Sequence, residues 1–397
     1  MNVIADPAIV SDGEGPLTDW RGVGYLVGIA TERLTAPVEG IHRALLERWF
    51  GLAGPRLEPA RRAVDVLAAS IYKTIRLSGN AAGVAVATGA AYADRSGTLR
   101  PVWETRRGRY VRSIFNGVWG DRFADDVSPI RIELGLRNAE GRQISMTPAE
   151  LDKAFRAPTG RIAVLLHGFA ETERSWRSGE KWEMAEALEG DGFSVLRVRY
   201  NTGRAVTDNG RDLDELLEQL QLAWPVPITD IALIGHSMGG LVARSAVVAG
   251  RSLRRTWVEL AKHLVAIAAP HFGSPIEKGV QILSNGLGFF KESRPLSVFL
   301  NQRSVGIKNL RYGVYQGDVG VGVKYHVVAG AFTADPTHPL GLLMGDLVVR
   351  VGSATGVGRA GHLGAADVLV VGGRNHARLS SDPEVISQVR AWLTPTQ

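Results

Sequence analysis

Apolar residues recur at helical spacing through the first part of the chain. From about residue 22 to residue 76 they fall three or four positions apart, which is the period of an amphipathic helix. Pro55 and Pro59 interrupt the run, so we predict two or three helices in a region that reaches to about residue 115. The apolar positions that define these helices include Ile41, Leu45, Leu46, Phe50, Val64, Leu67, Ile71 and Ile75.

Beyond about residue 125 the pattern changes to short apolar runs that alternate with helical segments. This alternation is typical of a mostly parallel sheet covered by helices on both faces. The first part is expected to be a hairpin, with strands at 130–137 and 142–146 joined by a turn at 138–141. Six β runs follow within residues 161–169, 193–200, 230–237, 262–270, 323–332 and 366–373, and helices are predicted near 180–189, 210–222, 240–249 and 383–393.

Small residues fill the stretch LSGNAAGVAVATGAAYA at residues 77–93, the longest uncharged segment of the chain. Its length approaches the roughly 18 residues that a membrane-spanning helix needs. Gly79 and Gly83 form a GxxxG pair, which lets two helices approach closely in membranes and in globular proteins alike. We favour a packed helix of a globular region, with a membrane segment as the alternative.

Composition and charge narrow the class of protein. Hydrophobic residues make up 45% of the 397 positions and charged residues 22%, so most of the chain is expected to fold. The absence of cysteine excludes disulfides, thiolate metal sites and a cysteine nucleophile. The net charge of +6 comes from scattered basic residues, which gives no support to nucleic-acid binding. Residues 1–20 are acidic and interrupted by Pro and Gly, so we expect a flexible N-terminus without a secretory signal, and a cytoplasmic protein.

The candidate chemistry centres on the run Gly235-His236-Ser237-Met238-Gly239, which follows an apolar strand pattern and precedes a helical one. This is G-x-S-x-G in the strand–turn–helix context that holds a nucleophilic serine. The turn is so tight that Ser237 is expected in a strained backbone conformation, with its hydroxyl exposed and no room for side chains at the flanking glycines. The alternative is a Gly-rich turn that carries a serine by chance, and the strand and helix around it disfavour that interpretation.

A serine hydroxyl becomes a good nucleophile only when a neighbouring base takes its proton. We choose His376 as the base, because it lies just past the last predicted strand, where a loop returns it to the same sheet edge as Ser237. Three other histidines fit less well because of their places in the pattern. One precedes the last strand, one lies between prolines and one lies within a strand, namely His362, His338 and His326.

The base in turn needs a carboxylate to orient it, and two aspartates follow the strand predicted at 323–332. We choose Asp346, because it lies in the loop-then-apolar segment GDLVVRVGSA. Asp335 precedes Pro336, a pair that is more often part of a turn. A helix cap or a surface turn remains the alternative role for Asp346.

A tetrahedral oxyanion needs two preorganised N–H donors, which such folds take from the residue after the nucleophile and from a loop after an earlier strand. These are Met238 and Phe169, the latter in the segment LLHGF at residues 165–169. The chain lacks P-loop, G-x-G-x-x-G and HExxH motifs, and its nine histidines have no metal-ligand spacing. We therefore expect no cofactor and no metal.

The segments LLHGF, LIGHSMGGLVAR, AAPHFGSP, GDLVVRVGSA and NHARL together resemble the α/β-hydrolase superfamily over about residues 160–395. The resemblance is greatest to lipase- and esterase-like members, including those related to the catalytic domain of GPI inositol-deacylases. It implies a mostly parallel central sheet with helices on both faces, a triad of Ser237, Asp346 and His376, and an oxyanion hole at Phe169 and Met238. The acid loop departs from the pattern, since many relatives carry an extra glycine after the aspartate.

The expected function is hydrolysis of carboxylic esters of the lipase or esterase type through an acyl-enzyme, with a small-molecule or lipid ester as substrate. The same framework also serves acyltransferases, thioesterases and intracellular polyester depolymerases, which remain alternatives. An alternative of another class is a catalytically idle binding protein that keeps the fold. The sequence does not determine the oligomeric state.

We expect the helical region at residues 21–125 to act as a cap on an α/β-hydrolase domain at residues 126–397. Pairing with a second copy, or contact with a lipid or polyester surface, would equally cover its apolar residues. Within the larger domain, residues 271–322 are longer than a crossover helix requires, and we interpret them as a candidate lid. Leu287 and Phe290 lie on its apolar stripe and are our candidates for substrate binding.

Overall fold

In a computed structural model, the chain forms two compact units. One unit is residues 1–109, 123–131 and 278–303, and the other is residues 110–122, 132–277 and 304–397. The division of the chain into a cap at 21–125 and a catalytic domain at 126–397 stays a prediction. The structure describes residues 16–53, 58–97, 99–103, 105–123, 130–179, 181, 183–274, 304–312, 319–355, 357–358, 361–362, 364–365 and 367–394.

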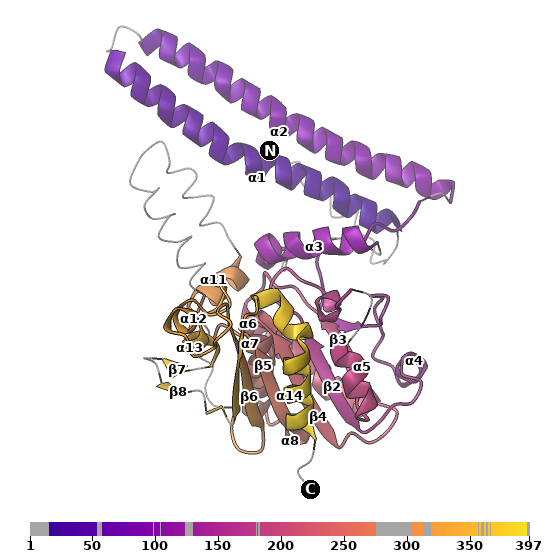
Figure 1. Cartoon of the computed structure of the whole chain (residues 1–397). Helices are drawn as coiled ribbons and strands as arrows, with labels where there is room; N and C mark the ends of the chain where they lie inside the picture. Colours follow the sequence, from indigo (N-terminus) through magenta and orange to yellow (C-terminus); the bar gives the residue numbers. More distant parts are fainter. Residues whose placement is uncertain are drawn as a thin grey trace. The chain divides into compact units, whose positions relative to one another are not determined.

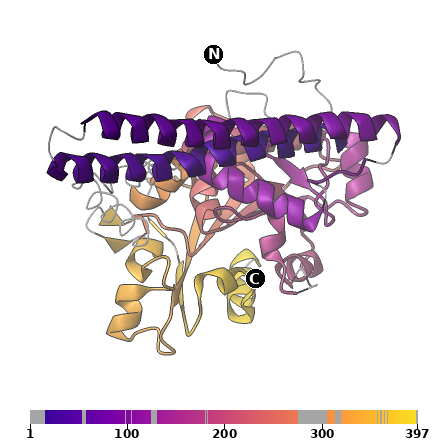
Figure 2. The same ribbon diagram turned by 90° about the horizontal axis from the view of Figure 1, so that it is seen from above.

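The first unit contains two long helices, α1 (Pro16–Ala53) and α2 (Glu58–Arg95). They run side by side in both views (Figure 1, Figure 2). Pro59 lies in the first turn of α2, where the missing N–H of proline breaks no helical hydrogen bond. The helical N-terminal region that the apolar spacing predicted is thus confirmed, and the helices are longer than the pattern suggested.

Glycines bring the backbones of α1 and α2 into contact. A Cβ atom added at Gly83 of α2 would lie 2.4 Å from the carbonyl oxygen of Gly24 in α1, and one added at Gly24 would lie 2.3 Å from that of Gly83. At Gly79, the other member of the GxxxG pair, the space of a Cβ atom is taken by the side chain of Thr31, whose Oγ1 would lie 2.4 Å away. The small residues therefore serve close packing of two helices. Among the helices that the structure describes, none is long and apolar enough to cross a membrane.

A seven-stranded sheet forms the centre of the second unit, with the strand order β1-β3-β2-β4-β5-β6-β9. All neighbours in it are parallel except β1, which pairs antiparallel with β3. The six β runs predicted after the hairpin are all strands of this sheet. The strands are β1 (Gly135–Arg137), β2 (Arg161–Leu166), β3 (Ser194–Arg199), β4 (Asp230–His236), β5 (Ala261–Ile267), β6 (Lys324–Ala331) and β9 (Asp367–Gly372).

The predicted hairpin is present only in part. Its turn closes through hydrogen bonds from Asn138 N–H to Arg142 O (3.0 Å) and from Gly141 N–H to Asn138 O (2.9 Å). The strand before it is short, because the backbone N–H of Ile132 donates to the side chain of Asn116 (3.0 Å) instead of to a neighbouring strand. The second arm at 142–146 contributes one isolated bridge, from Gln143.

Helices cover both faces of the sheet. Successive residues of a strand point to opposite faces, and here the residues on both faces are apolar and buried. In β2, Ile162, Val164 and Leu166 join the core under α6 (Val206–Ala223) and α7 (Met238–Ser252). Residues Ala163 and Leu165 join the core on the other face, under α5 (Glu183–Gly190) and α14 (Pro383–Leu393). In Figure 1, α5 and α14 lie in front of the sheet and α6 and α7 behind it. The fully buried apolar runs of the sequence are thus explained by a sheet with two covered faces.

The candidate lid at 271–322 falls mostly outside the described residues, as do Leu287 and Phe290, so both assignments stay predictions. Within that range the structure describes one helix, α11 (Val305–Tyr312). The remaining elements are short, apart from the helix that precedes β1. They are α3 (Arg106–Trp119), η3 (Gly120–Arg122), α4 (Pro148–Ala154), η4 (Glu173–Trp176), α8 (Trp257–Leu260), α12 (Pro339–Met344), α13 (Val351–Ala354), β7 (Val357–Gly358), β8 (Gly361–His362) and η5 (His376–Ser381).

Candidate active site

The candidate nucleophile lies at the sharp turn between β4 and α7. Ser237 has φ 52° and ψ −120°, a conformation that L-residues rarely adopt, and its N–H donates to Ile267 O at 2.7 Å. A Cβ atom at Gly235 would lie 2.3 Å from the backbone of Gly239, and one at Gly239 would lie 2.4 Å from Leu166 O. Only glycine fits at either position, so the G-x-S-x-G spacing follows from the tightness of the turn.

The turn around Ser237 is closely packed, and 7% of the surface of the whole residue is exposed. The turn packs directly against neighbouring strand ends, as the hydrogen bond to Ile267 and the contact of Gly239 with Leu166 demonstrate. The expectation that the hydroxyl itself is exposed stays a prediction.

His376 and Asp346 meet at the same edge of the sheet. His376 Nδ1 lies 2.7 Å from Asp346 Oδ2, and the side chains are 14% and 1% exposed. The second oxygen of Asp346, Oδ1, accepts hydrogen bonds from the N–H groups of Val348 (3.0 Å) and Val349 (2.8 Å). Asn375 accepts a bond from Arg378 N–H (3.2 Å) and so begins the short helix η5, on which His376 is the first residue.

The loop of Asp346 contains a backbone conformation that L-residues rarely adopt. Leu347 has φ 76°, in the left-handed region that favours glycine, and follows Gly345 and Asp346 in a turn closed by Asp346 N–H to Val349 O at 3.2 Å. The side chain of Leu347 is half-exposed.

The alternative acid and bases lie elsewhere in the structure. Asp335 is exposed, and its carboxylate accepts from Thr337 N–H (2.8 Å) as part of a turn. His326 is buried beside His263 and Asp367, at the ends of β5, β6 and β9 where those strands begin. His338 is exposed near α12, and His362 belongs to the small β7–β8 ladder. Of the two candidate acids, Asp346 is the one hydrogen-bonded to His376.

Ser237 and His376 are not hydrogen-bonded to each other, although the structure describes both. The residue before Ser237, His236, is in contact with His376. Nε2 of His236 lies 3.0 Å from the carbonyl oxygen of His376, and the ring centroids of the two histidines are 4.9 Å apart. Ser237, His376 and Asp346 therefore lie at one edge of the sheet, after β4, β9 and β6.

The loop that follows β2, residues 167–171, lies at the same edge of the sheet as Ser237. We call it the β2 loop. Ala170 has φ 56°, and its N–H donates to Thr202 Oγ1 at 3.1 Å. Within the part of the chain that the structure describes, the N–H groups of Phe169 and Met238, our candidate oxyanion donors, donate to no acceptor. The ring of Phe169 packs against Gly117 of α3, where an added Cβ would lie 3.1 Å away.

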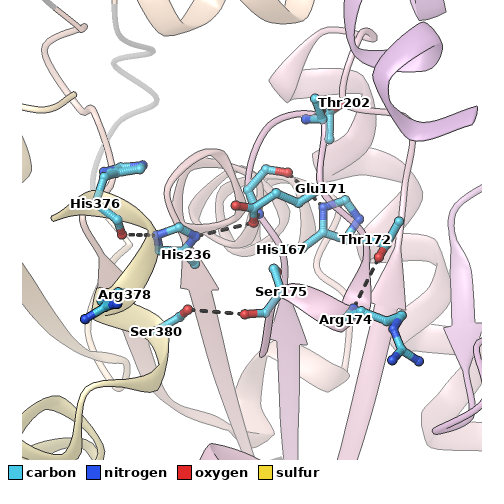
Figure 3. A network of polar contacts seen from close by, with 12 residues as sticks. His167, Glu171, Thr172, Arg174, Ser175, Thr202, His236, His376, Arg378 and Ser380 are labelled. Atoms are coloured by element: carbon cyan, nitrogen blue, oxygen red, sulfur yellow. Dashed lines mark hydrogen bonds and ion pairs between the residues drawn. The ribbon is translucent and has the colours of Figure 1, made fainter. Parts of the chain in front are cut away.

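Two residues beside the candidate site were not identified from the sequence. Glu171 ends the β2 loop, and His236 is the variable position inside G-x-S-x-G, which we had treated as spacing. Glu171 Oε2 accepts from Gly168 N–H (2.9 Å) and lies 3.5 Å from His236 Nδ1 (Figure 3). The signal that could have found them is an ionisable residue inside G-x-S-x-G and another two positions after LLHGF.

Burial and nearby charges act in opposite directions on the pKa values of Glu171 and His236. Burial raises the pKa of Glu171, but His236 and the N–H of Gly168 outweigh burial and lower that pKa to about 2. Burial also lowers the pKa of His236, whereas the carboxylate of Glu171 and the carbonyl of His376 raise it above its ordinary value. The two groups thus stabilise each other in their charged forms. No group of three or more His, Asp or Glu residues in the described segments could hold a metal ion.

The strand order, the antiparallel edge strand β1 and the serine turn after β4 together define the α/β-hydrolase fold. The chain is therefore an α/β-hydrolase-fold protein, as its sequence resemblance indicated. Residues 198–293 match the profile of a family described as PGAP1-like alpha/beta domain, which agrees with the resemblance to GPI inositol-deacylase catalytic domains. No curated protein sequence matches the chain.

Solved structures with related chain folds include a Bacillus licheniformis lipase in its mature form, at 18% identity and a TM-score of 0.44, over 61% of this chain and 96% of that one. An alpha/beta hydrolase fold protein from Chitinophaga pinensis has 13% identity and a TM-score of 0.39, over 60% and 91%. A Pyrococcus furiosus esterase has 19% identity and a TM-score of 0.37, over 59% and 83%. Because these values are low, the fold assignment rests on the strand order and the serine turn.

Proposed function

We propose that the chain is a serine hydrolase of carboxylic esters, with Ser237 as nucleophile, His376 as base and Asp346 as the group that orients the base. The observation that carries the proposal is the 2.7 Å contact between His376 Nδ1 and Asp346 Oδ2. It lies at the sheet edge where Ser237 occupies its strained turn. A histidine held through Nδ1 leaves Nε2 as the free nitrogen, which is the one that a serine base uses.

The geometry supports a two-step reaction. His376 Nε2 takes the Ser237 proton as Oγ bonds to the acyl carbon, while Nδ1–H stays hydrogen-bonded to Asp346. When the bond to the alcohol oxygen breaks, His376 returns that proton to the departing oxygen and an acyl-enzyme remains. Water then gives a proton to His376 and bonds to the acyl carbon. The proton returns to Ser237 as the carboxylic acid leaves.

Two backbone donors would stabilise the oxyanion formed in both steps. Met238 is the first residue of α7, so its N–H has no partner within the helix. This N–H belongs to the positive end of the helix dipole, which favours a negative charge nearby. Phe169 N–H lies in the β2 loop, which Thr202 holds in place through Ala170 N–H. Donors fixed before the reaction need no rearrangement during it, and removing one donor of this kind slows catalysis by roughly 10² to 10³.

The test is hydrolysis of short-chain p-nitrophenyl esters by the wild type and by Ser237→Ala. The proposal expects turnover by the wild type and its loss in the variant, while equal rates in the two would refute it. An added alcohol that diverts the product from acid to ester would instead favour acyl transfer. Absence of turnover on oxygen esters, thioesters and polyesters alike would favour a binding protein that keeps the fold. A phosphonate that labels wild-type Ser237 would mark the acyl-binding surface.

A further inference from the structure

The pair of Glu171 and His236 joins three segments that the proposed reaction needs. Glu171 closes the β2 loop by accepting from Gly168 N–H, and its Oε2 also lies 3.5 Å from His236 Nδ1. His236 immediately precedes Ser237 and lies 3.0 Å, through Nε2, from the carbonyl oxygen of His376. Figure 3 shows the chain of contacts from the β2 loop through His236 to η5.

The partners of the two ring nitrogens determine the protonation of His236. A carbonyl oxygen only accepts hydrogen bonds, so Nε2 must carry a proton to bond to His376 O. A neutral ring protonated at Nε2 would then direct the lone pair of Nδ1 at the carboxylate of Glu171, which is repulsive. The Nδ1 contact at 3.5 Å is a contact between charges and not a hydrogen bond. It is attractive only when Nδ1 carries a proton as well, that is, when His236 is an imidazolium.

We propose that Glu171 and a doubly protonated His236 form a partly buried ion pair that positions the β2 loop and His376 around Ser237. The ring of His236 is 1% exposed and Glu171 is 30% exposed, so the pair is largely shielded from solvent. Such a pair acts through other residues, and neither member needs to touch the substrate. The pair as a whole is neutral, so it adds no net charge beside His376.

Other groups that face His236 support the charged state. Asp346, behind His376 in the loop after β6, adds a second negative charge at longer range, and the backbone of His376 in η5 presents its carbonyl. The direction of the His236 pKa, raised in spite of burial, agrees with the geometry. Space at this point is also limited, because a Cβ at Gly168 would lie 2.9 Å from Glu171 Oε2 and 3.2 Å from His236 Nδ1.

The decisive measurement is the titration of His236 in the full chain, by NMR of selectively ¹⁵N-labelled histidine. His236→Gln identifies its resonances among those of the nine histidines. In the wild type both nitrogens should be protonated at pH 7, with a midpoint above the ordinary value of a histidine. Glu171→Gln keeps an oxygen for Gly168 N–H but removes the charge, so the midpoint should fall and one nitrogen should lose its proton near neutral pH. A neutral His236 in the wild type, or an unchanged midpoint in Glu171→Gln, overturns the proposal.

Glu173→Gln is the matched control. Glu173 lies two residues further along the same segment, but its carboxylate pairs with Arg199. Loss of that charge is expected to lower stability without moving the His236 midpoint. A shift of the midpoint as large as that in Glu171→Gln would mean that any loosening of this segment changes His236, and the specific pair would be refuted.

The kinetic consequence rests on the proposed function. Glu171→Gln and His236→Gln should each lower kcat for a p-nitrophenyl ester by roughly 10- to 100-fold with little change in KM, and the double variant should resemble either single one. Additive losses would refute a joint role. If the wild type hydrolyses no ester, the proposed function fails, while the titration still decides the pair. If the wild type is active but His236 is neutral, the pair fails and the proposed function stands.

Discussion

His376 Nδ1 lies 2.7 Å from Asp346 Oδ2, although the two residues are 30 positions apart and follow different strands of the sheet. Their contact follows from the parallel arrangement of β6 and β9, which ends both strands at one edge. The Asp346 loop is fixed independently, because its other carboxylate oxygen accepts two backbone N–H groups. An acid held in this way can set the orientation of the histidine and its tautomer.

The first prediction concerns these three residues as a unit. Ser237→Ala and His376→Ala should each lower kcat by several powers of ten, and the double variant should be hardly slower than either. Asp346→Asn should lower kcat by on the order of 10⁴-fold, because an amide no longer holds the imidazole in the required tautomer. Asp335→Asn is the control, since Asp335 is an exposed turn residue and should leave kcat unchanged. Clearly additive losses, or a damaging Asp335→Asn, would contradict the assignment.

A second prediction concerns acid stability. Burial, reinforced by the charge of Arg244, lowers the pKa of His271 to about 3. The unfolded chain takes up a proton at this residue below about pH 6.5, but the folded chain does not, so stability is lost as the pH falls from about 6.5 towards 3. The contribution is about 1.4 kcal/mol per pH unit inside that window. His271→Gln should therefore flatten the decline in the free energy of unfolding between pH 6.5 and pH 5.

The control for this measurement is Tyr325→Phe. Tyr325 Oη lies 2.7 Å from His271 Nε2, so the variant removes a hydrogen bond but leaves the imidazole buried. Because burial is the main cause of the shift, Tyr325→Phe should keep the acid-dependent decline. An equal decline in the wild type and in His271→Gln would show that other groups govern it.

A third prediction compares a buried ion pair with an exposed one. Arg199 donates to both carboxylate oxygens of Glu173, at 2.6 and 2.7 Å, with side chains 7% and 0% exposed. Arg199→Leu should lower the free energy of unfolding by about 3 to 5 kcal/mol, because it leaves a buried carboxylate without its partner. The pair of Arg390 and Asp191 has the same two-bond geometry but is more exposed.

Arg390→Leu should therefore lower the free energy of unfolding by less than about 1 kcal/mol. Denaturant titration of the two variants measures the difference. A double variant, Glu173→Leu with Arg199→Leu, should recover much of the loss of the single one, because no unpaired charge remains. Equal effects of the buried and exposed substitutions would refute this account.

A fourth prediction concerns the contact of α1 with α2. Gly83→Leu places a side chain where even a Cβ would lie 2.4 Å from Gly24 O, so the helices must separate. The loss of packing should lower the free energy of unfolding of the helical unit by roughly 1 to 3 kcal/mol or more, and its melting temperature with it. Gly89→Ala in the same helix is the control. A Cβ there meets nothing within 4 Å, and alanine should raise helix stability by about 0.5 to 1 kcal/mol.

Circular dichroism melting of the two variants distinguishes them, since both change a glycine in α2. If Gly83→Leu is as stable as the wild type, the close approach of the two backbones is not required. The GxxxG spacing would then have no packing role in this unit.

The order of the β runs and helices was predictable because buried parallel strands and their covering helices have strong and different periodicities. The serine turn was equally predictable, since only glycine fits at Gly235 and Gly239. The first arm of the predicted hairpin was not predictable, because the side chain of Asn116 in the preceding helix accepts a hydrogen bond from the N–H of Ile132.

The sequence by itself determined the α/β-hydrolase fold, the helical N-terminal region and the candidates Ser237, His376 and Asp346, because each depends on local spacing or on the chain order of a motif. The choice of Asp346 over Asp335 was made from the sequence, and the structure places Asp346 against His376. The tertiary structure alone decided that Glu171 meets His236. The physical reason is that a contact between the ends of different strands depends on the strand order and register of the whole sheet. The local sequence around Glu171 or His236 does not show either of these properties.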